Sequence, residues 1–102
     1  MNAKCREKSE LLPNQPGVYL FKDDAGRPIY VGKAKSLRSR VRSYFQDYRP
    51  PDEKRDLMLE AACDFETIVV DNEKEAIALE NNLIKQFKPR YNILLRDDKS
   101  YP

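Results

Sequence analysis

The sequence contains no histidine, so no imidazole can act as a base, an acid or a metal ligand. Its two cysteines, Cys5 and Cys63, lie far apart and belong to no CxxC pair, so we expect reduced thiols and neither a disulfide framework nor a zinc site. No apolar run approaches the roughly 20 residues of a membrane-spanning helix, and the first residues lack the apolar core of a signal peptide. We therefore expect a cytoplasmic protein that makes no contact with a membrane.

Length and composition predict one small globular domain. The chain has 102 residues, of which 40% are hydrophobic and 35% are charged, a balance that fits a soluble domain with a heavily ionised surface. We expect residues 1–102 to form this single domain. The tail YNILLRDDKSYP contains no stop signal that we can identify, which favours a fragment of a longer multidomain protein.

The positive charge is concentrated in one segment. Residues 27–49 contain seven basic side chains and one acidic one, a net charge of +6, whereas the other 79 residues carry a net charge of −4. Clustered positive charge favours contact with a polyanion such as a phosphate backbone. The alternative is a solvated helix face with no binding role.

The hydrophobic pattern predicts an α+β domain with a small three-stranded antiparallel sheet flanked by helices. Two runs rich in aromatic and β-branched residues, 17–23 and 28–33, flank the turn sequence DAGR and read as a hairpin, and 64–71 reads as a third strand. Four helices are expected, at 4–12, 36–47, 53–62 and from Asn72 or Glu73 to Phe87, where Pro89 ends the last one.

A four-residue hairpin loop, 23–26, would fix the register of the two strands. It pairs Leu20 with Ile29, Val18 with Val31, and Tyr19 with Tyr30. The aliphatic side chains would then share one face of the sheet and the two tyrosines the other.

Two of the three glycines fall at the ends of these strands. In the expected register Gly17 faces Gly32, which would leave room for a ligand backbone. After Gly32 come Lys33 and Lys35, and Ser36 is a plausible N-cap for the next helix, so its N-terminus is a natural phosphate site. The alternative is that Gly32 merely ends the strand.

The helix at 36–47 carries arginine on two different flanks. Its apolar stripe consists of Leu37, Val41, Tyr44, Phe45 and Tyr48. Arg40 falls one turn before Tyr44 and next to it, which suggests part of a site, although Arg40 could simply lie along the edge of the core. Arg38 and Arg42 fall on the opposite flank and are expected to hold a phosphate backbone or to be solvated.

Glu80 interrupts the apolar stripe of the last helix. The stripe consists of Ala76, Leu79, Leu83, Ile84 and Phe87. An inward carboxylate costs several kcal/mol unless it is paired or binds a metal. Glu80 therefore either pairs with a basic residue or anchors one hard divalent cation, Mg²⁺ or Mn²⁺, whose remaining ligands would be water and substrate phosphate.

The ordered set GVY at 17–19, IYVGK at 29–33, Arg40, Tyr44 and Glu80 resembles the GIY-YIG nuclease superfamily. Further runs, among them PGVYLFKD, VGKAKSLRSRVRSYF and EAIALENNLIKQFKPRYN, are similar to the UvrC branch of that superfamily. Val18 and Val31 stand where the tripeptides usually have isoleucine, a swap of similar volume. The resemblance implies the GIY-YIG fold and a metal-dependent endonuclease that cuts DNA on the 3′ side of a lesion in bacterial nucleotide excision repair.

The resemblance also implies roles for individual residues. The catalytic set would be Tyr19, Tyr30, Lys33, Arg40, Tyr44, Glu80 and Asn92, with one Mg²⁺ or Mn²⁺ ion on Glu80. The DNA backbone would be held by Gly32, Lys35, Arg38 and Arg42. The expected partners are damaged double-stranded DNA and UvrB, the latter contacted mainly through parts of a full-length protein that this chain does not contain. We expect the isolated domain to be monomeric.

Without histidine, the proton of the attacking water must go elsewhere. The resemblance gives Tyr30 as the base, and we expect Lys33, Arg40 and a metal ion to favour its phenolate form, because the reference pKa of tyrosine is about 10. A competing mechanism leaves Tyr30 to position the water and uses hydroxide as the nucleophile. Two non-enzymatic functions remain open: a DNA-binding module without catalysis and a surface that docks a protein partner.

Overall fold

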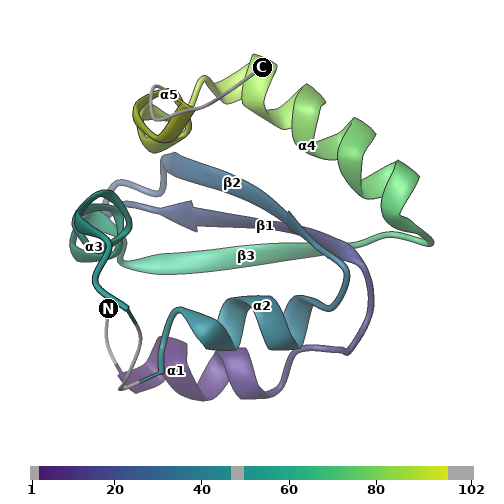
Figure 1. Cartoon of the computed structure of the whole chain (residues 1–102), viewed down its shortest axis with the longest axis horizontal. Coiled ribbons are helices and arrows are strands. Elements are labelled where there is room, and N and C mark those ends of the chain that lie inside the picture. The colour runs from purple at the N-terminus through teal and green to yellow at the C-terminus, as the bar shows by residue number, and fades with distance from the viewer. Residues whose placement is uncertain (1–2, 47–49, 97–102) are drawn as a thin grey trace.

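The computed structural model describes residues 3–46 and 50–96 and confirms the predicted α+β architecture (Figure 1). The elements, in chain order, are α1 (Ala3–Glu10), β1 (Gly17–Lys22), β2 (Pro28–Ala34), α2 (Leu37–Ser43), α3 (Glu53–Ala61), β3 (Asp64–Val69), α4 (Glu73–Phe87) and α5 (Arg90–Arg96). The strands form one antiparallel sheet in the order β2-β1-β3. Helices α1 and α2 cover one face of the sheet, and α4 and α5 lie over the other (Figure 1).

The hairpin register differs from the predicted one by two residues. Tyr19 pairs with Gly32 rather than with Tyr30, and Tyr30 pairs with Phe21. Lys22 pairs with Pro28, so the loop 23–27 is one residue longer than expected, and an irregularity in the pairing between Phe21 and Lys22 adds the second residue. Within the loop, an oxygen of Asp23 accepts hydrogen bonds from the backbone N–H groups of residues 25 and 27 at 3.0 and 2.9 Å. A slip of two residues preserves the alternation of side chains, so the two faces of the sheet keep their predicted character at every position named above except Ile29.

Each face of the sheet carries its own core. On the α4 face, Val18, Leu20 and Val31 pack with Ala76 and with the half-buried side chains of Leu79, Leu83 and Ile84. The other face holds an aromatic cluster of Tyr19, Phe21, Tyr44 and Phe65 together with Leu37 and Val41. Ile29 belongs to the aromatic cluster and not to the aliphatic face as expected, because the pairing of β1 with β2 is irregular between Phe21 and Lys22.

Neither strand glycine leaves the open space that the sequence suggested. Gly17 pairs with Ala34, and a side chain there would collide with the carbonyl of Ile68 and with Leu37. A side chain at Gly32 would collide with the ring of Tyr19. Both glycines therefore admit protein atoms rather than a ligand, and this prediction is wrong.

The helix boundaries follow the predicted caps. Ser36 caps α2 by accepting a hydrogen bond from the N–H of Ser39 at 3.3 Å, and Asn72 caps α4 in the same way at 3.0 Å. Helix α2 ends at Ser43, about one turn earlier than expected, so that Tyr44 and Phe45 lie in the turn after it. Tyr48, the last member of the expected stripe, lies outside the described residues.

Helix α4 ends at Phe87 as predicted, before Lys88 in the left-handed conformation (φ 46°) and Pro89. Phe87 itself is 41% exposed, so it does not belong to the apolar face of α4 as expected. Helix α5 was not predicted, because the residues after Pro89 show a mixed pattern. Within the described ranges, every helix is too short or too polar to span a bilayer.

Candidate active site

The hydroxyl groups of two buried tyrosines meet beside an arginine at the face of the sheet covered by α2. The Tyr19 and Tyr44 oxygens are 2.9 Å apart, and Nε of Arg40 donates a hydrogen bond to the Tyr19 oxygen at 3.2 Å. The Arg40 guanidinium also lies over the Tyr44 ring, 5.6 Å from its centroid. Arg40 and Tyr44 are thus neighbours, as the helical spacing predicted. Because Tyr19 is only 1% exposed, its hydroxyl fixes the side chains of Arg40 and Tyr44 and does not itself reach the solvent.

Tyr30 lies half-buried on the edge strand β2, with its ring centroid 6.3 Å from that of Tyr19. Burial raises the pKa of Tyr30 well above its usual value, the charges of Tyr44 and Glu80 raise it further, and Arg40 only partly offsets them. The pKa thus moves opposite to the direction that we expected from the nearby positive charges. Burial among these groups therefore favours the neutral phenol form of Tyr30.

Glu80, on α4, is half-buried and lies close enough to Lys33 and Tyr30 of β2 that Lys33 affects its pKa and that it affects the pKa of Tyr30. Burial raises the pKa of its carboxyl group, whereas the ammonium and the backbone N–H of Lys33 lower it. Among residues 3–46 and 50–96, no basic side chain forms an ion pair with Glu80 within 4.0 Å, although Lys33 lies near enough to affect its pKa. A direct ion pair between Glu80 and a basic side chain, which was the alternative to metal binding, is therefore not formed among the described residues.

The surroundings of Glu80 fit a single hard cation. In the described part of the chain, no three acidic or cysteine side chains are placed to hold a metal ion together. The partial burial of Glu80 and its lack of a direct ion pair leave a carboxylate that gains from a cation. Magnesium commonly binds to one or two carboxylates and keeps water and phosphate oxygens as its other ligands.

Asn92 holds the edge strand from α5 and does not face the open site. Its side-chain oxygen accepts a hydrogen bond from the N–H of Val31 at 2.8 Å, and its amide nitrogen donates to the carbonyl of Val31 at 2.8 Å. Asn92 is 7% exposed and Val31 is fully buried. The amide supplies the two bonds that a further strand would make, and so fixes β2 between Tyr30 and Gly32.

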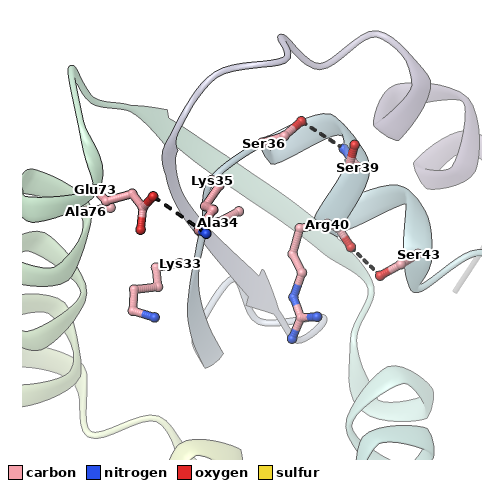
Figure 2. Close-up of a pocket in the computed structure, with 9 residues that line it drawn as sticks. All are labelled: Lys33, Ala34, Lys35, Ser36, Ser39, Arg40, Ser43, Glu73 and Ala76. Atoms are coloured by element: carbon pink, nitrogen blue, oxygen red, sulfur yellow. Dashed lines mark hydrogen bonds and ion pairs between the residues drawn. The ribbon is translucent and has the colours of Figure 1, made fainter.

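A groove of about 570 Å³ leads away from Arg40 between α2, the end of β2 and α4 (Figure 2). Its polar lining consists of Lys33, Lys35, Ser36, Ser39, Arg40, Ser43 and Glu73. Lys35 forms an exposed ion pair with Glu73 at 3.9 Å across the groove. Ser36 was expected here as the helix N-cap, whereas Ser39 and Ser43 were missed, although their spacing of four residues places them on one side of α2 and could have revealed them.

Three residues expected to touch DNA lie outside this groove. The Nε of Arg38 donates a hydrogen bond at 2.7 Å to the carbonyl of Leu12, which lies in the segment that follows α1. Arg42 is exposed but does not line the groove, and Gly32 lies under the Tyr19 ring. Of the four expected backbone-binding residues, only Lys35 lines the groove.

A model of the UvrC-like GIY-YIG domain matches residues 15–93. This chain belongs to the UvrC-like GIY-YIG family. It is 65% identical over 99 residues to UvrABC system protein C of Solibacter usitatus and 64% identical over 96 residues to that of Koribacter versatilis. The alignments cover 97% and 94% of this UvrC-like domain but only 16% of each relative, so the chain spans about a sixth of their length.

Solved structures agree with this assignment. The UvrC-like domain is similar to the GIY-YIG N-terminal endonuclease domain of UvrC from Thermotoga maritima, whose structure contains magnesium as its catalytic divalent cation. The two share 52% sequence identity and superimpose with a TM-score of 0.80, covering 89% of this chain and 98% of that one. A point mutant of the same domain with alanine in place of asparagine, also bound to its catalytic divalent cation, matches with the same TM-score, at 52% identity over 89% of this chain and 97% of that one. The GIY-YIG fold of this domain is thereby confirmed.

Proposed function

We propose that this domain is a metal-dependent endonuclease that hydrolyses a DNA phosphodiester bond. It would form part of a longer UvrC protein that acts in the bacterial cytoplasm and incises DNA on the 3′ side of a lesion. One observation carries the proposal: the half-buried carboxylate of Glu80 has no direct ion pair and lies near Lys33 and Tyr30. Arg40 is also close enough to Tyr30 to affect its pKa. Carboxylate, guanidinium and phenol together suit the hydrolysis of a phosphate ester.

The groove would hold the DNA backbone. Lys33 and Lys35 supply positive charge, and the hydroxyl groups of Ser39 and Ser43 can donate hydrogen bonds to phosphate oxygens. Arg40 lines the groove, and its guanidinium is held by the Tyr19 hydroxyl. A fixed cation at this position offsets the negative charge that grows on the phosphoryl group in the transition state.

Glu80 would hold one Mg²⁺ or Mn²⁺ ion. Such an ion, when bound, supplies Lewis-acid stabilisation of the phosphate and of the leaving oxygen. The chain contributes the rest: Glu80 fixes the position of the ion, Lys33 adds positive charge beside it, and Asn92 keeps β2, and with it Tyr30, in place.

Tyr30 would contact the attacking water. Its raised pKa favours the neutral phenol, which would position the nucleophile by a hydrogen bond while hydroxide, which needs no base to remove a proton, attacks the phosphate. The alternative is that Tyr30 is the base. A comparison of the pH dependence of incision by the wild type and by Tyr30→Phe separates the two, because loss of the base would change the pH profile, whereas loss of a positioning hydroxyl would lower the rate at every pH.

The remaining parts of the nuclease complex would come from elsewhere. The described residues contain no feature that distinguishes damaged from intact DNA, so recognition of the lesion would be supplied by partners such as UvrB, bound through other parts of the full-length protein. The isolated domain would then be a monomer with weak intrinsic affinity for DNA.

The test replaces Glu80 in the full-length protein. We expect Glu80→Gln to abolish Mg²⁺-dependent 3′ incision of a damaged duplex by the assembled repair complex and to leave DNA binding within about twofold of the wild type. Glu60→Gln, which removes one exposed carboxylate from α3, is the matched control and should incise normally. Incision that survives in Glu80→Gln would refute the metal assignment, and a wild type that binds but never cuts would favour a DNA-binding module without catalysis.

A further inference from the structure

A second hollow adjoins the site on the side of α3. It has a volume of about 190 Å³ and is lined by Tyr30, Arg40, Ser43, Tyr44, Asp52, Arg55 and Met58. Arg40 and Ser43 also line the larger groove, so the two hollows meet at the Arg40 side chain. A bound DNA strand that fills the groove and passes Arg40 would enter this second hollow next.

Arg55 is the group in this hollow that the proposed mechanism does not use. Its side chain is 24% exposed, and its Nη2 atom donates a hydrogen bond to the carbonyl of Pro50 at 2.5 Å. The buried Nε forms a long ion pair with the Asp56 carboxylate at 3.8 Å, but it has no hydrogen-bond acceptor among the described residues. A buried donor without an acceptor is unfavourable and gains from a ligand that accepts its hydrogen bond.

The charges that line the hollow also favour an anion. Two guanidinium groups, those of Arg40 and Arg55, reach it, and Asp52 contributes the single carboxylate. One oxygen of Asp52 is already engaged, because it accepts a hydrogen bond from the N–H of Arg55 at 3.1 Å and caps α3. Guanidinium groups bind phosphate oxygens well, since their planar N–H donors match the geometry of the anion.

We propose that this hollow binds the DNA phosphate adjacent to the one that is cleaved, with Arg55 as its main ligand. The inference rests on the proposed endonuclease function and extends it: the cleaved phosphate lies between Arg40 and Glu80, and the strand continues past Tyr30 toward α3. Arg55 is then a substrate-binding residue whose loss weakens the hold on one flanking phosphate.

The experiment combines a substitution with charge removal at single phosphates of the DNA. Damaged duplexes carry one neutral methylphosphonate at each of three positions on either side of the 3′ incision site in turn, and the full-length protein in the assembled complex incises them. The wild type should incise one of the immediately flanking substitutions about tenfold more slowly than unmodified DNA, as expected for a lost charge-assisted hydrogen bond. Arg55→Ala should incise unmodified DNA about tenfold more slowly and show no additional penalty at that position. Lys4→Ala removes one positive charge from the exposed face of α1, outside both hollows, and should keep the wild-type pattern.

A merely structural role for Arg55, through its bond to Pro50, would slow incision without changing the pattern of phosphate sensitivity. An Arg55→Ala protein that keeps the wild-type penalty at every position would overturn the inference, as would a wild type that tolerates every flanking substitution. Arg55→Gln, which retains an amide donor for the Pro50 carbonyl, serves in the same comparison if the alanine variant does not fold. Absence of 3′ incision by the wild type would refute the proposed function itself and this inference with it, an outcome distinct from normal incision without coupling to Arg55.

Discussion

The hydrogen bonds between Asn92 and Val31 predict a large structural effect for one small substitution. Asn92→Ala removes both 2.8 Å bonds and leaves the N–H and the carbonyl of a fully buried residue without partners. Each buried backbone group left unpaired costs about 1–3 kcal/mol. Water can enter the space vacated by the amide and recover part of that cost. We therefore expect a loss of about 3 kcal/mol in the free energy of unfolding, or a decrease in Tm of roughly 15 °C for a domain of this size.

Chemical denaturation of the 102-residue chain measures this loss directly. Asn82→Ala, at an exposed position on α4, is the control and should change the free energy of unfolding by less than about 0.5 kcal/mol. Asn92→Asp tests the direction in which stability changes with pH. It keeps an acceptor for the Val31 N–H but turns a carboxylate oxygen toward the Val31 carbonyl, so the pKa of the new carboxyl group is raised and its destabilising effect should grow as the pH rises from 4 to 7. An Asn92→Ala protein as stable as the wild type would refute the claim that α5 holds the edge strand through this amide.

Three further predictions concern packing, charge and pH. Gly32→Ala places a methyl group against the Tyr19 ring and should lower the free energy of unfolding by about 2 kcal/mol in a denaturant titration, and an unchanged midpoint would contradict the observed register. Lys35→Ala should reduce the slope of log DNA affinity against log salt concentration by about 1, because Lys35 lines the groove. Arg38→Ala should leave this slope unchanged. It should instead lower the free energy of unfolding by about 1 kcal/mol, because the hydrogen bond to the Leu12 carbonyl is lost. Burial raises the pKa of Tyr19 well above 10.0. The preference for its neutral form therefore stabilises the fold fully below pH 10, and this contribution is lost as the pH rises further. Between pH 9 and 12 the Tm of Tyr19→Phe should fall less than the Tm of the wild type, as measured by thermal unfolding.

The order of the three strands and of helices α1 to α4 could be predicted because each of these elements carries its own local signal, whereas α5 shows none. Ser36 and Asn72 are N-cap residues that indicate where two helices begin, and Pro89 indicates where one ends. Alternating aromatic and β-branched residues indicate the strands. The register could not be predicted in the same way. It depends on a loop one residue longer than expected, in which Asp23 accepts two backbone hydrogen bonds, and on an irregularity in the strand pairing between Phe21 and Lys22.

The candidate site was predictable only where it follows helical periodicity. The neighbouring positions of Arg40 and Tyr44 follow from a spacing of four residues, and the inward direction of Glu80 follows from the apolar stripe around it. The direction of the Tyr30 pKa shift was not predictable, because it is set mainly by burial among elements that are distant in sequence. The same holds for Asn92, whose partner lies 61 residues away.

The central claim is that Glu80 anchors the catalytic cation at the edge of β2. A crystal of this domain soaked in Mn²⁺, with anomalous scattering used to locate the metal, tests it most directly. The structure predicts one anomalous peak within coordinating distance of the Glu80 carboxylate, on the side that faces Tyr30 and Lys33. A peak at another carboxylate such as Glu73, with Glu80 free of metal, would contradict the account.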